Sequence, residues 1–401
     1  MRLRTYESFW LLSNGLLYSY PSLPDQHTTS EIVVVGGGIT GALISHALME
    51  KGYQVLLLDK RDIANGSTAA TTSMLQYEID VPLYQLMEMI GEEAAVQCYK
   101  CGIEAIHNLG ALIRKQRFDC GFEQKQSLYI ARKQKDMSWL KTEFTRRNQY
   151  DLGVKWLDAA EIKKDYGICC YGGILSEVAA SVDAYKLAHE LIAFNVSRGM
   201  KVYDQTVIKE VGRHKGQHQI VTESGGRISC KKIVYCTGYE ATEHLKERTA
   251  DVFYTYACVS EQEIEIPEKL HKTLVWDTGS PYLYMRSTND GRLLVGGEDA
   301  LSGHTFFQNR IKERKSAKLQ KMLVKMMPDI RFIEDFSWAG LFGTTKDGLP
   351  YIGESPEHPD ALFVLGFGGN GITFSVQGMK IVTDLLEGKS NPLAHAYRFG
   401  R

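Results

Sequence analysis

The stretch Glu31-Ile-Val-Val-Val-Gly-Gly-Gly-Ile-Thr-Gly41 decides the fold of this chain. Four β-forming residues lead directly into glycines spaced as G-x-G-x-x-G, at Gly36, Gly38 and Gly41, and a helix-like apolar pattern follows. The first glycine permits a tight turn, the second lets a pyrophosphate approach the backbone, and the third lets the helix pack against the strand. An anion is favoured at the N–H groups of such a helix start. The stretch therefore predicts a dinucleotide-binding unit, whose residues 36–41 we call the first glycine turn.

The next predicted strand ends in an acidic residue at the position that a ribose requires. Gln54-Val-Leu-Leu-Leu-Asp59 is typical of a buried strand, and Asp59 lies close to the spacing of about 20 residues at which a carboxylate binds ribose hydroxyls. Lys60 and Arg61 are of the residue type that can contact a 2′-phosphate, but the acid at position 59 disfavours that group. No second complete dinucleotide motif follows, so we expect one dinucleotide and no nicotinamide cofactor.

Length, charge and cysteine content limit the possible functions. The 401 residues suffice for two domains. A formal charge of -1 gives no electrostatic case for binding nucleic acid or an anionic membrane, and no apolar run reaches the roughly 18 residues that a membrane span requires. Eight cysteines do not make a disulfide scaffold over this length. Cys98-x-x-Cys101 has no second pair at zinc spacing. We therefore expect reduced thiols, no metal site, a small-molecule substrate and a cytoplasmic location.

Two segments beside the first strands have unusual composition. Residues 1–30 contain Trp10, Tyr18 and Tyr20, and this aromatic content predicts an arm packed on the protein rather than a disordered tail. Residues 60–75 are small, rich in hydroxyl groups and nearly free of bulky side chains. Such a segment suits backbone that wraps closely around a flat ligand, although an ordinary surface loop is the alternative.

The strand–turn–helix pattern recurs near the end of the chain. The predicted strand at residues 228–235 leads into Cys236-Thr237-Gly238, which suggests a second backbone contact to the same dinucleotide. A buried strand is then predicted at 361–365, followed by glycine-rich residues 366–371, which we call the second glycine turn, and by a helix over 372–387. One helix N-terminus for each half of a dinucleotide is consistent with the charge that such ends present.

A second sheet is predicted from about residue 250 onward. Alternating residues at 281–286 indicate a strand, and Asn289-Asp290-Gly291 indicates a hairpin turn after it. The alternation places Tyr282, Tyr284 and Arg286 on one face of this strand. These three side chains either line a substrate pocket or form the polar outer face of a hairpin.

Together these motifs resemble the D-amino-acid oxidase-like family of flavoproteins, which includes glycine and sarcosine oxidases. The resemblance covers roughly residues 31–390 and is carried by the following segments: both glycine turns, Asp59, Gly66-Ser67-Thr68, Val182-Asp183, Cys236-Thr237-Gly238, Trp338 to Gly353 and Ile372. It implies an α/β fold with a discontinuous Rossmann-like FAD-binding domain and a second α+β domain built on an antiparallel sheet. The implied segments are an N-terminal arm at 1–30, an FAD-binding domain at 31–80, 165–245 and 335–401, and a substrate domain at 81–164 and 246–334.

The resemblance also implies which residues contact FAD. The first glycine turn would hold the pyrophosphate, Asp59 the adenosine ribose, and residues 68–75 the isoalloxazine. Val207 would contact adenine through its backbone, and residues 368–372 would place N–H groups beside flavin N1 and the C2 carbonyl, where a helix N-terminus stabilises developing negative charge. The predicted cofactor contacts are Gly36, Gly38, Ile39, Thr40, Gly41, Asp59, Lys60, Ser67, Thr68, Thr71, Thr72, Ser73, Met74, Val207, Thr237, Gly238, Gly340, Gly368, Gly369, Asn370, Gly371 and Ile372.

The chain departs from the family pattern in two places. In relatives that oxidise amino acids, an arginine that clamps the substrate carboxylate commonly follows the W-x-G-x unit, but here that position is Phe342. A phenyl ring cannot make a bidentate carboxylate contact, so either Arg286 supplies the clamp or the substrate has no α-carboxylate. No His or Cys matches the family's covalent flavin attachment with certainty, which favours non-covalent FAD.

The sequence thus predicts an FAD-dependent oxidoreductase that removes hydride from the carbon next to nitrogen in an amine or amino acid. The substrate-side residues proposed from sequence are Tyr282, Tyr284 and Arg286. Two alternatives stay open: a hydroxy-acid or polyol dehydrogenase on the same scaffold, and a flavin-bound assembly factor without catalysis.

Overall fold

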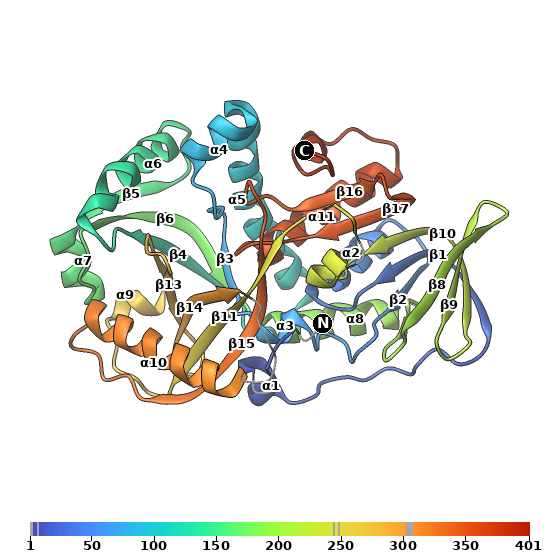
Figure 1. The fold of residues 1–401 in the computed structure, drawn as a ribbon, viewed down its shortest axis with the longest axis horizontal. Helices are drawn as coiled ribbons and strands as arrows, with labels where there is room; N and C mark the ends of the chain where they lie inside the picture. Colours follow the sequence, from blue (N-terminus) through green and yellow to red (C-terminus); the bar gives the residue numbers. More distant parts are fainter. Residues whose placement is uncertain (1–2, 6–7, 244, 248, 302–307) are drawn as a thin grey trace.

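The structure is a computed structural model that describes residues 3–5, 8–243, 245–247, 249–301 and 308–401. It contains two large sheets, and Figure 1 shows them in opposite halves of the molecule, with strands β1 and β10 in one half and β4 and β6 in the other. The predicted fold class, a discontinuous Rossmann-like α/β unit beside a largely antiparallel α+β unit, is confirmed.

The first sheet is built around parallel strands from three distant parts of the chain. Its order is β16-β17-β10-β1-β2-β7, with β8 and β9 attached beside β10. Strands β17, β10, β1, β2 and β7 run parallel. The bounds are β1 His27–Val35, β2 Val55–Leu58, β7 Lys201–Tyr203, β8 Ile208–His214, β9 Gln217–Thr222, β10 Arg227–Tyr235, β16 Tyr351–Ser355 and β17 His358–Leu365.

Both faces of the first sheet are covered, so its central strands are apolar on both sides. In β1, Ile32 and Val34 face one core and Val33 faces the other. The first of these cores is covered by four helices, α2 (Ile39–Glu50), α5 (Glu92–Gln116), α8 (Ala184–Ser197) and α11 (Gly371–Leu386). The 3₁₀ helix η2 (Gly238–Glu243) contributes to the opposite core. Asp183 is the N-cap of helix α8, because its carboxylate accepts the Lys186 backbone N–H at 2.8 Å.

The second sheet has the order β15-β11-β14-β13-β12-β4-β6-β3, with β5 beside β6. Its strands pair antiparallel except for β12 and β4. The bounds are β3 Met74–Gln76, β4 Glu123–Ile130, β5 Val154–Asp158, β6 Gly172–Ser181, β11 Asp251–Ser260, β12 Thr273–Asp277, β13 Leu283–Ser287, β14 Leu293–Leu301 and β15 Glu334–Thr344. By sheet membership, β3, β6 and β15 belong here although they fall in the predicted FAD-binding segments; the domain boundaries stay a prediction.

The remaining helices are short or lie over the second sheet. Figure 1 shows α6, α7, α9 and α10 around its outer side, and α5 between the two halves. The bounds are α1 Phe9–Asn14, α3 Ser67–Ala70, α4 Leu83–Ile90, η1 Gln134–Asp136, α6 Met137–Gln149, α7 Ala159–Tyr166, α9 Glu268–His271, α10 Gln308–Met326 and α12 Pro392–Ala396. Within the described segments, no helix combines the length and the apolar character that crossing a membrane requires.

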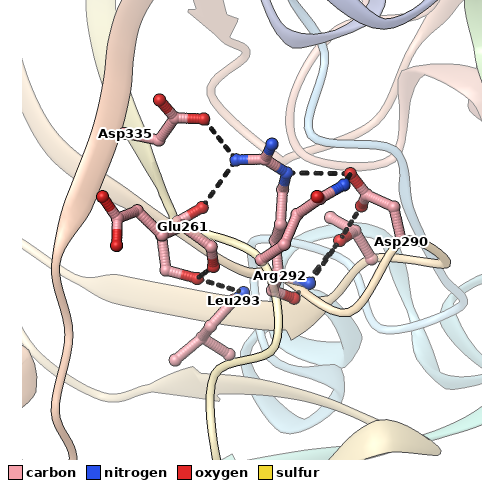
Figure 2. Close-up of polar contacts among 8 residues, drawn as sticks. Glu261, Asp290, Arg292, Leu293 and Asp335 are labelled. Atoms are coloured by element: carbon pink, nitrogen blue, oxygen red, sulfur yellow. Dashed lines mark hydrogen bonds and ion pairs between the residues drawn. The ribbon is translucent and has the colours of Figure 1, made fainter.

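The predicted hairpin between β13 and β14 is confirmed, and Arg292 anchors its turn. Figure 2 shows the Arg292 guanidinium between Asp290 and Asp335; its Nε donates to Asp290 at 2.8 Å, and its Nη1 donates to the Ser260 carbonyl at 2.9 Å and to Asp335. The Ser260 hydroxyl in turn accepts the Leu293 N–H at 2.9 Å. These contacts join the hairpin to β11 and to the start of β15, which fixes β13, the strand that carries Tyr284 and directly follows Tyr282.

The N-terminal arm packs on the protein as the aromatic content predicts. Thr5 N–H donates to Ala339 O at 2.9 Å and Leu341 N–H donates to Leu3 O at 2.8 Å, so residues 3–5 extend the edge of β15. Helix α1 follows, and the ring centroid of Phe9 lies 6.2 Å from those of Phe336 and Trp338. The arm therefore forms part of the wall at the junction of the two sheets.

Candidate active site

A cavity of about 920 Å³ lies between the two sheets and is lined by both glycine turns. Its walls come from the carboxyl ends of β1, β2 and β10, from the segment 60–80, and from β11, β13 and β15 of the second sheet. Ligands of open α/β sheets bind at this edge, beyond the carboxyl ends of the strands. The position and size of the cavity make it the candidate active site.

The first glycine turn is glycine-rich because its backbone has no room for side chains. A Cβ on Gly36, whose φ is 107°, would overlap the carbonyl oxygen of Cys236, and a Cβ on Gly41 would overlap the carbonyl oxygen of Gly36. Gly38 is the N-cap of α2 and supplies no side-chain cap. The start of α2 therefore presents backbone N–H groups to the cavity, which is the arrangement that binds a phosphate.

The start of α11 faces the same cavity from the other end of the chain. The Thr40 and Ser375 hydroxyls are hydrogen-bonded at 2.7 Å, which places the first turns of α2 and α11 side by side. The Asn370 side chain, at the N-cap of α11, does not cap the helix but donates to the Gln76 carbonyl at 2.8 Å. Residues 368–372 line the cavity, so the positive ends of two helices face one cavity.

Asp59 lies at the end of β2, deep in the protein but open to the cavity. Its carboxylate accepts the Gly37 N–H at 2.6 Å and the Arg61 N–H at 2.8 Å. Burial raises the pKa of this carboxyl to about 6, although both backbone hydrogen bonds act in the opposite direction. The neighbouring cations Lys60 and Arg61 are held by Glu240, with Nζ of Lys60 2.8 Å from its carboxylate. Asp59 therefore keeps a carboxylate open to the cavity, and a carboxylate at the end of this strand is the residue type that receives ribose hydroxyls.

Three side-chain donors fix the backbone of the segment 70–72. Nε1 of Trp338 donates to Ala70 O at 2.8 Å, Nε1 of Trp10 donates to Thr71 O at 2.7 Å, and Nε of Arg286 donates to Thr72 O at 2.7 Å. The three donors come from β15, α1 and β13, and they bind three successive carbonyls. Thr71, Thr72 and Met74 line the cavity in front of this set of bonds, which we call the carbonyl clamp.

Most residues predicted to contact the cofactor line this one cavity. They are Gly36, Gly38, Ile39, Thr40, Asp59, Lys60, Ser67, Thr68, Thr71, Thr72, Met74, Val207, Thr237, Gly238, Gly340 and residues 368–372. Gly41 and Ser73 do not line it: Gly41 packs against the Gly36 carbonyl, and Ser73 is 1 % exposed. The predicted substrate-side tyrosines, Tyr282 and Tyr284, line the same cavity.

Arg286 lies elsewhere. It is 1 % exposed, donates to Thr72 O and to Ser287 O, and lines a separate cavity of about 560 Å³ behind the carbonyl clamp rather than the candidate active site. Its guanidinium carbon lies 5.6 Å from the ring centroid of Trp10. The alternation of residues 281–286 placed the three side chains on one face correctly, but the segment 70–72 separates Arg286 from the two tyrosines.

Several cavity residues on the second-sheet side were not predicted from sequence. They are Gln76, Glu78, Asp80, Thr255, Ala257 and Trp276. Asp80 accepts the Gly369 N–H, with oxygen distances of 3.1 and 3.3 Å. Glu78 is fully buried beside Arg147, at 3.6 Å. The sequence signal that could have indicated them is the acidic pair Glu78-x-Asp80, directly after the small-residue segment 60–75. Both acids line the cavity beside that segment.

No group of three His, Cys, Asp or Glu side chains within the described residues could hold a metal ion. The cavity lining instead combines the N-termini of two helices, the Asp59 carboxylate and backbone without side chains at the glycine turns. These features fit a dinucleotide whose second half is a flat ring system, because Thr71, Thr72 and Met74 line one part of the cavity beside the carbonyl clamp, and Trp276, Tyr282 and Tyr284 also line it.

Comparison with known proteins gives a consistent result. Residues 31–385 match the family model described as FAD dependent oxidoreductase. The chain is 26% identical to a glycine oxidase of Geobacillus kaustophilus, over 90% of this chain and 93% of that one. It is 25% identical to a putative Rieske 2Fe-2S iron-sulfur protein, YhfW, of Bacillus subtilis, over 96% of this chain and 74% of that one. The crystal structure of the Geobacillus glycine oxidase superposes with a TM-score of 0.75 at 22% identity, covering 93% of this chain and 99% of that chain.

Proposed function

This chain belongs to the family of FAD-dependent oxidoreductases, and we propose that its cavity binds one FAD and oxidises an amine or amino acid at the carbon next to nitrogen. The observation that carries the proposal is the convergence of the α2 and α11 N-termini, 335 residues apart at the Thr40–Ser375 hydrogen bond, on a cavity that also holds Asp59. That donor set matches a pyrophosphate, a ribose and an electron-accepting ring that becomes negatively charged.

The residues of this chain supply binding, orientation and electrostatics. Residues 36–40 would hold the pyrophosphate and Asp59 the ribose. Residues 368–372 would place N–H groups where negative charge develops, apart from the Gly369 N–H, which Asp80 accepts. Bound FAD would supply the acceptor for the hydride that the carbon next to nitrogen loses. Tyr282, Tyr284 and Trp276 shape the space on the second-sheet side and exclude water from it.

Non-covalent attachment of FAD is part of the proposal. Among described residues, the Cys and His side chains that line the cavity are Cys236, His218 and His358. Cys236 directly follows β10, His218 lies on β9 and His358 lies on β17, so all three are on the first-sheet side. Acid precipitation of the yellow protein is expected to leave the flavin in the supernatant. A yellow pellet after denaturation would overturn this part.

The reaction is tested by anaerobic mixing of purified FAD-loaded protein with a panel of amines and amino acids, followed at the flavin absorbance. Bleaching by at least one amine supports the proposal. Bleaching only by hydroxy acids or polyols would assign the chain to alcohol oxidation instead. If no donor of either panel bleaches the flavin while sulfite forms an adduct with it, the site is open but the proposed reaction is wrong.

Replacing Asp59 with asparagine is expected to weaken FAD binding about ten- to a hundredfold, because charged hydrogen bonds contribute about 1.5–3 kcal/mol. Burial raises the pKa of this carboxyl to about 6 in the cofactor-free protein, and the ionised form accepts both ribose hydroxyls. FAD affinity of the unsubstituted protein should therefore fall as the pH drops through about 6. Equilibrium titration of the cofactor-free protein from pH 5 to 8 measures both effects, and Asp59→Asn should show a flat profile.

We infer a reducing, cytoplasmic setting from the thiols. All eight cysteines are free, and five of them are buried. Free thiols persist where disulfides are reduced. The proposed partner is a small molecule, and the formal net charge of -1 gives no electrostatic reason to expect nucleic-acid binding.

A further inference from the structure

The charges around the candidate active site are distributed unevenly. Its lining cations are Lys60, Arg61, Lys209 and Arg213, all on the first-sheet side. Lys60 and Arg61 pair with Glu240, and Arg213 pairs with Asp360. Around the second-sheet wall, the described charged residues that line the cavity are Glu78 and Asp80, both acidic. The second-sheet half of the cavity, which the proposed function assigns to the substrate, therefore carries a net negative charge among its described lining residues.

Asp80 is the acidic group that a ligand can reach. Its side chain is exposed to the cavity although it lies deep in the protein. Its hydrogen bonds in the described structure go to the Gly369 N–H, and no described cation pairs with it. The negative charge of Asp299 on β14 also acts on it. A deep carboxylate without a cation is costly unless a ligand brings the opposite charge.

Glu78 adds to the same potential from behind the wall. Its side chain is fully buried and neither carboxylate oxygen has a hydrogen-bond partner in the described residues; its ion pair is Arg147 at 3.6 Å. Arg147 is shared with Glu143, 2.6 Å away. One guanidinium thus serves two carboxylates, which leaves this wall with net negative charge.

Aromatic rings complete the surroundings of Asp80. Trp276, Tyr282, Tyr284 and Phe342 line the cavity, and the Tyr282 and Tyr284 ring centroids lie 5.7 Å apart. A Cβ on Gly296 would overlap the Tyr284 ring, so this glycine makes room for it. Ring faces and a carboxylate attract ammonium groups and repel carboxylates.

We propose that the site is specific for amines that carry a second positive charge and no carboxylate, that is diamines and polyamines, and that Asp80 binds the second ammonium group. The proposal rests on the proposed amine oxidation and adds its substrate class. The reacting nitrogen is uncharged when it delivers hydride, so a second charged nitrogen is the group that the acidic wall recognises. Alkylamines of the same length lack this contact, and amino acids bring a repelled carboxylate.

The test compares 1,4-diaminobutane, butylamine and 4-aminobutanoate on the FAD-loaded protein. Binding is measured from the perturbation of the oxidised flavin spectrum, and reduction is measured separately by anaerobic rapid mixing. The diamine is expected to bind about ten- to a hundredfold more tightly than butylamine, as for a charged hydrogen bond, and 4-aminobutanoate more weakly than butylamine. Asp80→Asn should remove the diamine preference, measured as the ratio of diamine affinity to butylamine affinity in the same variant. Asp384→Asn, an acid at the far end of α11 that pairs with Lys380, is the matched control and should keep the preference.

The pH dependence gives a second readout. Burial raises the pKa of the Asp80 carboxyl to about 6, and the neutral acid cannot pair with an ammonium group. Diamine affinity should therefore fall as the pH drops through about 6, while butylamine affinity changes less. The other titratable groups that interact electrostatically with Asp80 are Asp299, Tyr239 and Tyr282. Burial raises the pKa of Asp299, and it raises the pKa of both tyrosines, so they stay neutral. Loss of the pH effect in Asp80→Asn assigns it to this residue.

The outcomes separate the two proposals. The inference is overturned if diamine and butylamine bind equally well, or if the diamine preference survives Asp80→Asn. In either case amine oxidation still holds if butylamine or an amino acid bleaches the flavin. Tight, Asp80-dependent diamine binding without bleaching by any amine would keep the recognition of dications and reject the proposed reaction.

Discussion

Replacing Gly41 with alanine is expected to abolish measurable FAD binding. The added Cβ would overlap the carbonyl oxygen of Gly36, which is backbone and cannot rotate away. Either α2 shifts from β1 or the turn opens, and each displaces the N–H groups that hold the pyrophosphate. Overpacking of this kind costs about 1–3 kcal/mol, and loss of the phosphate contacts adds to it. The expected result is at least a hundredfold weaker FAD binding, about 2.7 kcal/mol or more, measured by titration of the cofactor-free protein and by the flavin content after purification.

Glu50→Ala, at the exposed end of the same helix, is the matched control. It removes a surface ion pair with Arg198, and such pairs contribute about 0–1 kcal/mol. Its FAD content should equal that of the unsubstituted protein. A yellow, stoichiometrically loaded Gly41→Ala protein would contradict the placement of the pyrophosphate at the first glycine turn.

Replacing Trp338 with alanine is expected to give the largest loss of stability, about 3–5 kcal/mol in the free energy of unfolding. The indole is 1 % exposed and packs beside Phe9 and Phe336, and removing a buried tryptophan leaves a cavity of this cost. It also removes the donor to Ala70 O, one of the three bonds of the carbonyl clamp. Denaturant unfolding of the cofactor-free protein measures the change.

Trp338→Phe separates the hydrogen bond from the packing. It keeps a ring but leaves the Ala70 carbonyl without its donor, at about 1–3 kcal/mol. Trp10→Phe does the same to the Thr71 carbonyl. Because the clamp fixes the segment 70–72 along the predicted isoalloxazine site, both variants should also weaken FAD binding. Unchanged unfolding and unchanged FAD affinity in both would show that the clamp has no role in shaping the site.

The N-terminal arm illustrates how far sequence patterns reach. Its aromatic content predicted packing, and it does pack, against β15 and the segment 70–72. Its contribution to the site could not be predicted, since Trp10 acts on Thr71, which is 61 residues away in the sequence. A hydrogen bond from an indole to one particular carbonyl leaves no periodicity or motif in the chain.

Arg286 and Asp80 show two limits of prediction from sequence patterns: the surroundings of a predicted residue, and a residue whose role depends on a distant segment. Strand alternation correctly placed Arg286 on the face of Tyr282 and Tyr284, yet alternation carries no information about what lies between side chains on one face. There the segment 70–72 intervenes, and the guanidinium binds its backbone instead of lining the cavity. For Asp80 the only sequence signal was the acidic pair Glu78-x-Asp80, which does not indicate a role. Its position in the site was not predicted, because it depends on the Gly369 N–H, 289 residues later.

The sequence by itself determined the cofactor side of this protein: the two glycine turns, Asp59 and their order, hence the α/β fold and the FAD family. These features are local, because a turn without room for a Cβ, a helix start and a ribose carboxylate each need a few residues at fixed spacing. Only the tertiary structure shows which residues surround the proposed substrate side. Which charges meet across the cavity depends on the packing of β3, β13, β15 and α11, and electrostatic contacts between distant segments follow distance in space, not spacing along the chain.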